Sequence, residues 1–105
     1  MAEKTRLEML RELYARDPKD GFVAYGLAME LQKKPATEAE ALKVFQNLVE
    51  DSASYLPTYF QVGVLLRRRG EPEEARKAYK QGITLASQLG ELHTKEELEA
   101  ALGTL

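Results

Sequence analysis

The sequence has no cysteine, no tryptophan and a single histidine among its 105 residues. Without cysteine the chain forms neither a disulfide nor a thiolate metal site, which fits a reducing compartment. No apolar run approaches the ~18 residues that a membrane helix needs. The first residues, Met1 to Arg6, carry charges where a signal peptide needs an apolar core. We therefore expect a soluble, cytoplasmic protein with no membrane partner.

The sequence also has no large excess of basic or acidic residues. The chain has 15 basic and 17 acidic residues, for a net charge of −2. A dedicated nucleic-acid binder gains its affinity by neutralising phosphates, so this balance argues against one. The basic residues between Arg67 and Lys80 are interrupted by Glu71, Glu73 and Glu74. We expect no nucleic-acid partner.

The residues of common catalytic sites are scarce or isolated. His93 is the only histidine, and we expect it on the surface near the start of the last helix. There is no cysteine nucleophile, and no serine has a histidine at a telling spacing. The carboxylates do not cluster with histidine as metal ligands do. We therefore expect no enzyme, no catalytic or metal-binding residue and no cofactor.

Helical signals, in contrast, run through the whole chain. Alanine, leucine, glutamate, lysine and arginine are abundant, and no stretch alternates apolar with polar residues. Capping boxes, in which a hydroxyl and a carboxylate satisfy the first amides of a helix, are predicted at Thr5-x-x-Glu8, Thr37-x-x-Glu40 and Thr94-x-x-Glu97. Proline or glycine ends most segments, and the polar turn 51–54 ends the third. We predict an all-α fold of about six helices, with antiparallel neighbours because the connections are short.

Two pairs of predicted helices repeat each other. The second and fourth helices align at a spacing of 37, which pairs Gly26 with Gly63, and the third and fifth at 34. A glycine inside a helix costs about 1 kcal/mol relative to alanine, so the matched pair predicts close helix approach at both places. The other aligned pairs are Phe22 with Tyr59, Tyr25 with Val62, Met29 with Leu66, Ala41 with Ala75, and Phe45 with Tyr79.

This pattern of a large residue, a glycine, an alanine and an aromatic resembles the tetratricopeptide repeat family. The resemblance covers residues 5–87, with a three-residue insertion in the first turn. It implies an antiparallel helix-hairpin stack, a right-handed superhelix with a concave face. Gly82 stands where the family prefers alanine, so we expect looser packing there. The expected organisation is one domain, 1–105, made of a half-repeat helix (4–16), a first repeat (19–52), a second repeat (56–89) and a capping helix (94–102).

The resemblance also assigns residues to two roles. The repeat-packing residues are Phe22, Tyr25, Gly26, Met29, Ala41, Phe45, Tyr59, Val62, Gly63, Leu66, Ala75 and Tyr79. The concave face is lined by the first helix of each pair, namely Val23, Leu27, Glu30, Leu31, Phe60, Gln61, Val64, Arg67 and Arg68. This second set is more apolar than a solvated surface, and large apolar patches are not left in water.

Three occupants of the concave face follow from that rule. The first is a partner peptide or helix, which makes the chain a non-catalytic protein-interaction module or adaptor. The second is the last helix of the chain, and the third is a second copy, which makes it a self-associating structural unit. The lysine and asparagine clamp by which some family members hold a carboxylate is missing. Arg67 and Arg68 have two possible roles. They complement the dipole of their helix, which is the interpretation we favour, or they pair with an acidic ligand.

Overall fold

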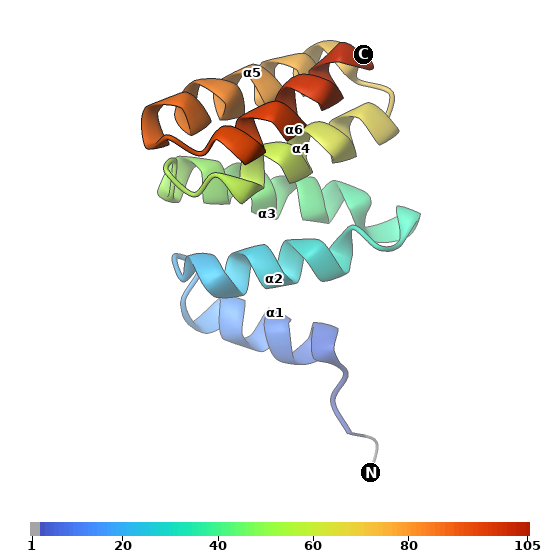
Figure 1. The fold of residues 1–105 in the computed structure, drawn as a ribbon. Helices are drawn as coiled ribbons and strands as arrows, with labels where there is room; N and C mark the ends of the chain where they lie inside the picture. Colours follow the sequence, from blue (N-terminus) through green and yellow to red (C-terminus); the bar gives the residue numbers. More distant parts are fainter. Residues whose placement is uncertain (1–2) are drawn as a thin grey trace. The chain divides into compact units, whose positions relative to one another are not determined.

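The computed structural model describes residues 3–105, and within that range it contains helices and no strand. The chain divides into two compact units, Met1–Ala53 and Ser54–Leu105. Unit 1 contains α1 (Arg6–Arg16), α2 (Gly21–Leu31), a short 3-10 helix η1 (Pro35–Thr37) and α3 (Glu38–Asp51). Unit 2 contains α4 (Pro57–Arg68), α5 (Pro72–Leu89) and α6 (Leu92–Gly103) (Figure 1). The all-α fold of six α-helices is confirmed for the described residues, whereas the grouping of all 105 residues into one domain stays a prediction.

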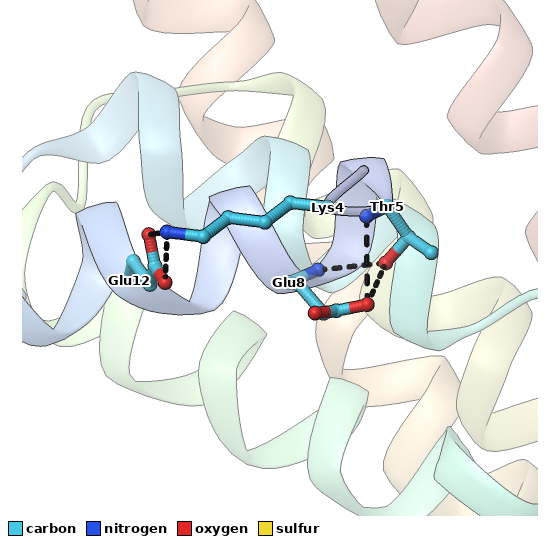
Figure 2. A network of polar contacts seen from close by, with 4 residues as sticks. All are labelled: Lys4, Thr5, Glu8 and Glu12. Carbon is cyan, nitrogen blue, oxygen red and sulfur yellow. Dashed lines mark hydrogen bonds and ion pairs between the residues drawn. The ribbon is translucent and has the colours of Figure 1, made fainter. Parts of the chain in front are cut away.

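The first predicted capping box is present at the start of α1. Thr5 Oγ1 accepts a hydrogen bond from the Glu8 amide at 3.1 Å, and the Glu8 carboxylate accepts one from the Thr5 amide at 3.5 Å. Lys4 reaches along the same helix to the Glu12 carboxylate at 2.7 Å (Figure 2). These contacts satisfy amides that the first turn of a helix leaves without partners.

The prediction of a second capping box, at Thr37-x-x-Glu40, is wrong. The Thr37 hydroxyl makes no capping bond to α3 and donates instead to the carbonyls of Leu31 and Lys34. The reason is the 3-10 turn η1, which ends at Thr37 and turns this side chain back toward the end of α2. Thr37 is therefore the N-cap residue of α3 by position, but its side chain bonds to the end of the first helix and does not cap the second.

The prediction of a third capping box, at Thr94-x-x-Glu97, is wrong for a different reason. Gly90 adopts the left-handed conformation, with φ of 72°, and ends α5. The next helix then starts at once, with Glu91 as the N-cap of α6 and Leu92 as its first residue. Thr94 consequently lies inside the first turn and cannot cap it.

The core of unit 1 lies between α2 and α3. α2 packs more extensively against α3 than against α1, and α1 (Arg6–Arg16) contains no buried residue. The buried side chains of α2 are Ala24, Leu27, Ala28 and Leu31, and those of α3 are Ala41, Val44, Phe45 and Leu48. The core of unit 1 thus combines small alanines of α2 with larger side chains of α3, including the ring of Phe45.

The core of unit 2 depends on two glycines. A Cβ atom added to Gly63 would lie 2.2 Å from Tyr79 Cε1, so the aromatic ring rests directly on the α4 backbone. A Cβ atom at Gly82 would lie 2.9 Å from Tyr59 Cβ and 3.0 Å from Leu98 Cδ1. The prediction of loose packing at Gly82 is therefore wrong, because Tyr59 and α6 fill the space that a methyl group would need.

The burial pattern also corrects the register of the two repeats. The buried residues Ala24, Leu27, Ala28 and Leu31 of α2 match Tyr59, Val62, Gly63 and Leu66 of α4 at a spacing of 35. Ring contacts give the same answer, since Tyr25 meets Phe45 and Phe60 meets Tyr79, both at 6.1 Å between ring centroids. The spacing of 37 is therefore wrong for α2 and α4.

The corrected register removes the predicted role of Gly26 in close helix packing. A Cβ atom there would meet only Leu10 Cδ2, at the ordinary contact distance of 3.5 Å. The residue of α2 that corresponds to Gly63 is Ala28, which is fully buried. With α3 and α5 still aligned at 34, the first repeat carries one extra residue, not three. Close approach through glycine is thus a property of unit 2 alone.

Candidate functional site: the α2 and α4 faces

Two sides of α2 are occupied by neighbouring helices. One side carries the buried residues that pack on α3. Another side meets α1, where Gly26 lies near Leu10 and Arg6 Nε donates to the Glu30 carboxylate at 3.0 Å. A hydrogen bond from Lys33 to the same carboxylate holds the pKa of Glu30 below its usual value, and Arg6 contributes to the shift.

The remaining side of α2 carries aromatic and sulfur-containing side chains. At 100° per residue, this side contains the residues that we call the α2 face, namely Phe22, Tyr25, Met29 and Gln32. Phe22 is 89% exposed, while Tyr25, Met29 and Gln32 are half-buried. The Gln32 amide donates to Met29 Sδ at 3.7 Å. Aromatic residues and methionine are the types enriched in protein interfaces.

The corresponding side of α4 is what we call the α4 face, and it consists of Phe60, Val64 and Arg67. These residues follow each other at intervals of four and three, so they lie on one side of the helix. Phe60 and Val64 are half-buried and Arg67 is exposed. The Phe60 ring is tilted by 52° against that of Tyr79, which fixes its orientation.

Arg67 is held in place by the end of α6. Its Nη1 donates to Thr104 Oγ1 at 2.8 Å, and that hydroxyl donates to the Ala101 carbonyl at 2.7 Å. The guanidinium also lies close enough to Tyr79 to affect it. Burial raises the pKa of Tyr79 above its usual value, and the charge of Arg67 lowers it in part.

The structure places the expected contact residues of α2 differently from the prediction. Leu27 and Leu31 are 2% and 0% exposed and belong to the core with α3, so their assignment as contact residues is wrong. Val23 is half-buried, and Glu30 is half-buried and ion-paired with Arg6 and Lys33. The physical reason is the two-residue error in register, which rotates the assigned face toward α3.

The expected contact residues of α4 lie closer to their predicted places. Phe60 and Val64 share one side of the helix with Arg67, and Gln61 is half-buried beside them. Arg68 is exposed, in the last turn of α4. Their role in binding a partner stays a prediction.

The expected packing residues on α2 differ from those on the other helices. Eight are buried as predicted, and these are Ala41, Phe45, Tyr59, Val62, Gly63, Leu66, Ala75 and Tyr79. The four on α2 are not, since Phe22 is exposed and Tyr25, Gly26 and Met29 are half-buried. Packing at Phe22 is therefore a wrong prediction.

Sequence reasoning therefore missed Phe22, Tyr25 and Met29 as surface candidates. The signal that would have found them is the run Ala24, Leu27, Ala28 and Leu31, which aligns with α4 at 35 if alanine is accepted in place of glycine. The identity of Gly26 with Gly63 favoured the spacing of 37 instead.

Residues 3–105 contain no group of three or more histidine, cysteine, aspartate or glutamate side chains placed to hold a metal ion. His93 is exposed, and its Nε2 lies 3.2 Å from the Glu97 carboxylate on the same helix. None of the helices in residues 3–105 is long and apolar enough to span a membrane.

Comparison with solved structures gives close matches. The solution NMR structure of a tetratricopeptide repeat domain protein from Salinibacter ruber is 35% identical, with a TM-score of 0.77, covering 84% of this chain and 88% of that one. The crystal structure of a tetratricopeptide repeat domain protein from the same organism is 34% identical, with a TM-score of 0.73, covering 81% and 93%. The crystal structure of MamA shares the fold at 16% identity, with a TM-score of 0.71, covering 92% and 63%. No protein-family model and no curated protein matches the chain.

Proposed function

Because the chain belongs to the tetratricopeptide repeat family, we propose that it is a non-catalytic module that binds a partner peptide or helix, with the α2 face and the α4 face each serving as a contact surface. Domains of this fold are in general protein-interaction modules. The proposal replaces the buried Leu27 and Leu31 with Phe22, Tyr25 and Met29 as the contact residues of α2. The expected cytoplasmic location stays a prediction.

The observation that carries the proposal is the exposure of Phe22. A phenylalanine that is 89% exposed loses most of the stabilisation that burial of its ring would give. Tyr25 and Met29, both half-buried, follow it at helical spacing on the same side of α2. Exposed apolar surface marks interaction sites in soluble proteins when it is contiguous.

Selection of peptides on the immobilised chain tests the proposal. Random 12-residue peptides are displayed and selected, and the enriched peptides are synthesised and titrated against the chain and its variants. We expect Phe22→Ser to weaken the binding of peptides that contact the α2 face, and Val64→Glu the binding of peptides that contact the α4 face, each about tenfold or more. Each change removes apolar contact area that a bound peptide would bury. Far-ultraviolet circular dichroism checks that both variants keep their helicity.

The matched control is Leu89→Ser. Leu89 is a large apolar residue that is also exposed, but it lies in the last turn of α5 and belongs to neither the α2 face nor the α4 face. We expect unchanged peptide affinity in this variant. Peptides that bind Phe22→Ser and Val64→Glu as well as they bind the unmodified chain would contradict the proposal.

A self-associating structural unit is the second candidate function. It is favoured by Met9 and Leu13, which are 49% and 44% exposed on one side of α1. A second copy that covers these residues would produce a dimer or larger assembly. Sedimentation equilibrium decides between the two, because a strictly monomeric chain at high concentration excludes self-association.

A further inference from the structure

Arg67 differs from the ion-paired cations of the described residues in what holds it. Its described partner is the neutral hydroxyl of Thr104, so residues 3–105 supply no described carboxylate for its charge. Other cations lie beside carboxylates, as in the pairs Arg6 with Glu30, Arg11 with Glu40, Lys33 with Glu30, Arg76 with Glu73 and Lys77 with Glu74. The guanidinium is therefore oriented without being neutralised by an ion pair.

The helix that carries Arg67 contains no carboxylate. The sequence of α4, from Pro57 to Arg68, has two basic residues and no acidic one. One and two turns before Arg67, the same side of the helix presents Val64 and Phe60. At a rise of 1.5 Å per residue, Val64 and Phe60 lie about 4.5 Å and about 10 Å along the axis from Arg67. The α4 face thus changes from apolar to cationic over a short distance.

We propose that the α4 face binds a partner segment in which a bulky apolar side chain lies within about three residues of a carboxylate. The apolar group contacts Phe60 and Val64, and the carboxylate accepts hydrogen bonds from the Arg67 guanidinium. This inference rests on the proposed function, since it specifies the chemistry of the partner at one of the two faces.

Two physical effects favour this ligand. The guanidinium presents five donors in a planar fork that matches the two oxygens of a carboxylate, and Thr104 occupies one of the five. Thr104 also lowers the cost of ordering the arginine side chain, because the bond exists before the ligand arrives. The end of the α6 dipole stabilises the cation in place, but it does not offer the bidentate acceptor that a carboxylate does.

The test uses the selected peptides and their amide analogues. We expect peptides enriched on the unmodified chain to carry aspartate or glutamate within about three residues of a large apolar residue. Replacing that acid by its amide should weaken binding to the unmodified chain about tenfold, as expected for loss of a charge-assisted bond. On the Arg67→Gln variant the acid and the amide should bind alike, which a double-mutant cycle measures as coupling.

Two further variants separate a specific contact from general charge. Arg76→Gln removes the same charge from α5, where Arg76 pairs with Glu73, and it should leave the acid preference intact. Thr104→Val removes the bond that orients Arg67, and it should reduce the acid preference severalfold without abolishing it. Circular dichroism confirms that each variant is folded.

The outcomes distinguish this inference from the proposed function. Enriched peptides that depend on Phe60 and Val64 but show no acid preference would overturn the inference and leave the proposed function standing. An acid preference that survives in Arg67→Gln, or that is lost equally in Arg76→Gln, would also overturn it. Peptides that bind regardless of substitutions on both faces, or an absence of enriched peptides, would contradict the proposed function itself.

Discussion

Unit 1 and unit 2 contain the same helix hairpin, but Phe22 of α2 and Tyr59 of α4 lie on different sides of their helices. In unit 2, Tyr59 is 7% exposed and helps to fill the core, while Gly63 gives the Tyr79 ring room to reach the α4 backbone. In unit 1, Ala24 and Ala28 take these two places. Phe22 lies outside the core of unit 1. In unit 2 the ring of Tyr59 stabilises the core, whereas in unit 1 the ring of Phe22 stays available for contact with a partner.

The largest expected difference is between Tyr59→Ala and Phe22→Ala. Tyr59→Ala removes a buried ring and should lower the free energy of unfolding by about 3 kcal/mol. Phe22→Ala removes an exposed ring and should change it by less than about 0.5 kcal/mol. Urea denaturation of both variants measures the difference, and similar losses would refute the corrected register.

Gly63→Ala should have the next largest effect. The added methyl group would lie 2.2 Å from the Tyr79 ring, so the ring or the helix must move. Overpacking of this kind costs about 2–3 kcal/mol, which corresponds to a melting temperature lower by roughly 10–20 °C in a domain of this size. Thermal unfolding followed by circular dichroism provides the measurement. An unchanged melting temperature would mean that Tyr79 does not rest on Gly63.

Gly26→Ala should have the smallest effect and the opposite sign. Its methyl group would meet Leu10 at an ordinary distance of 3.5 Å, and alanine favours a helix over glycine by up to about 1 kcal/mol. We expect a gain of about 0.5–1 kcal/mol in the same urea experiment. A loss comparable to that of Gly63→Ala would show that the two glycines are equivalent after all.

The helices themselves were predictable because their signals are local. The structure ends α1, α2 and α4 shortly before Pro18, Pro35 and Gly70, as the sequence indicates. The predicted capping box at Thr5 also forms. The boxes at Thr37 and Thr94 failed because each hydroxyl lies in a turn whose course depends on neighbouring residues. A 3-10 turn decides the first case and the left-handed Gly90 decides the second.

The faces were harder to predict because they depend on how α2 is rotated. Periodicity alone allows either stripe of α2 to face α3, since both stripes are apolar. The choice is made by packing, since the small Ala24 and Ala28 are buried in the core between α2 and α3 and the large Phe22 is exposed. On α4 a single glycine, Gly63, settles the rotation, and there the predicted face agrees in part with the structure.

The lack of buried side chains in α1 has a consequence for motion. This helix is attached to α2 through half-buried residues such as Leu10 and through ion pairs on the surface, including Arg6 with Glu30. Surface ion pairs contribute little, on the order of 0–1 kcal/mol each. α1 can therefore detach while the core between α2 and α3 stays intact, as a local opening far cheaper than global unfolding. Such an opening would uncover the side of α2 that carries Gly26.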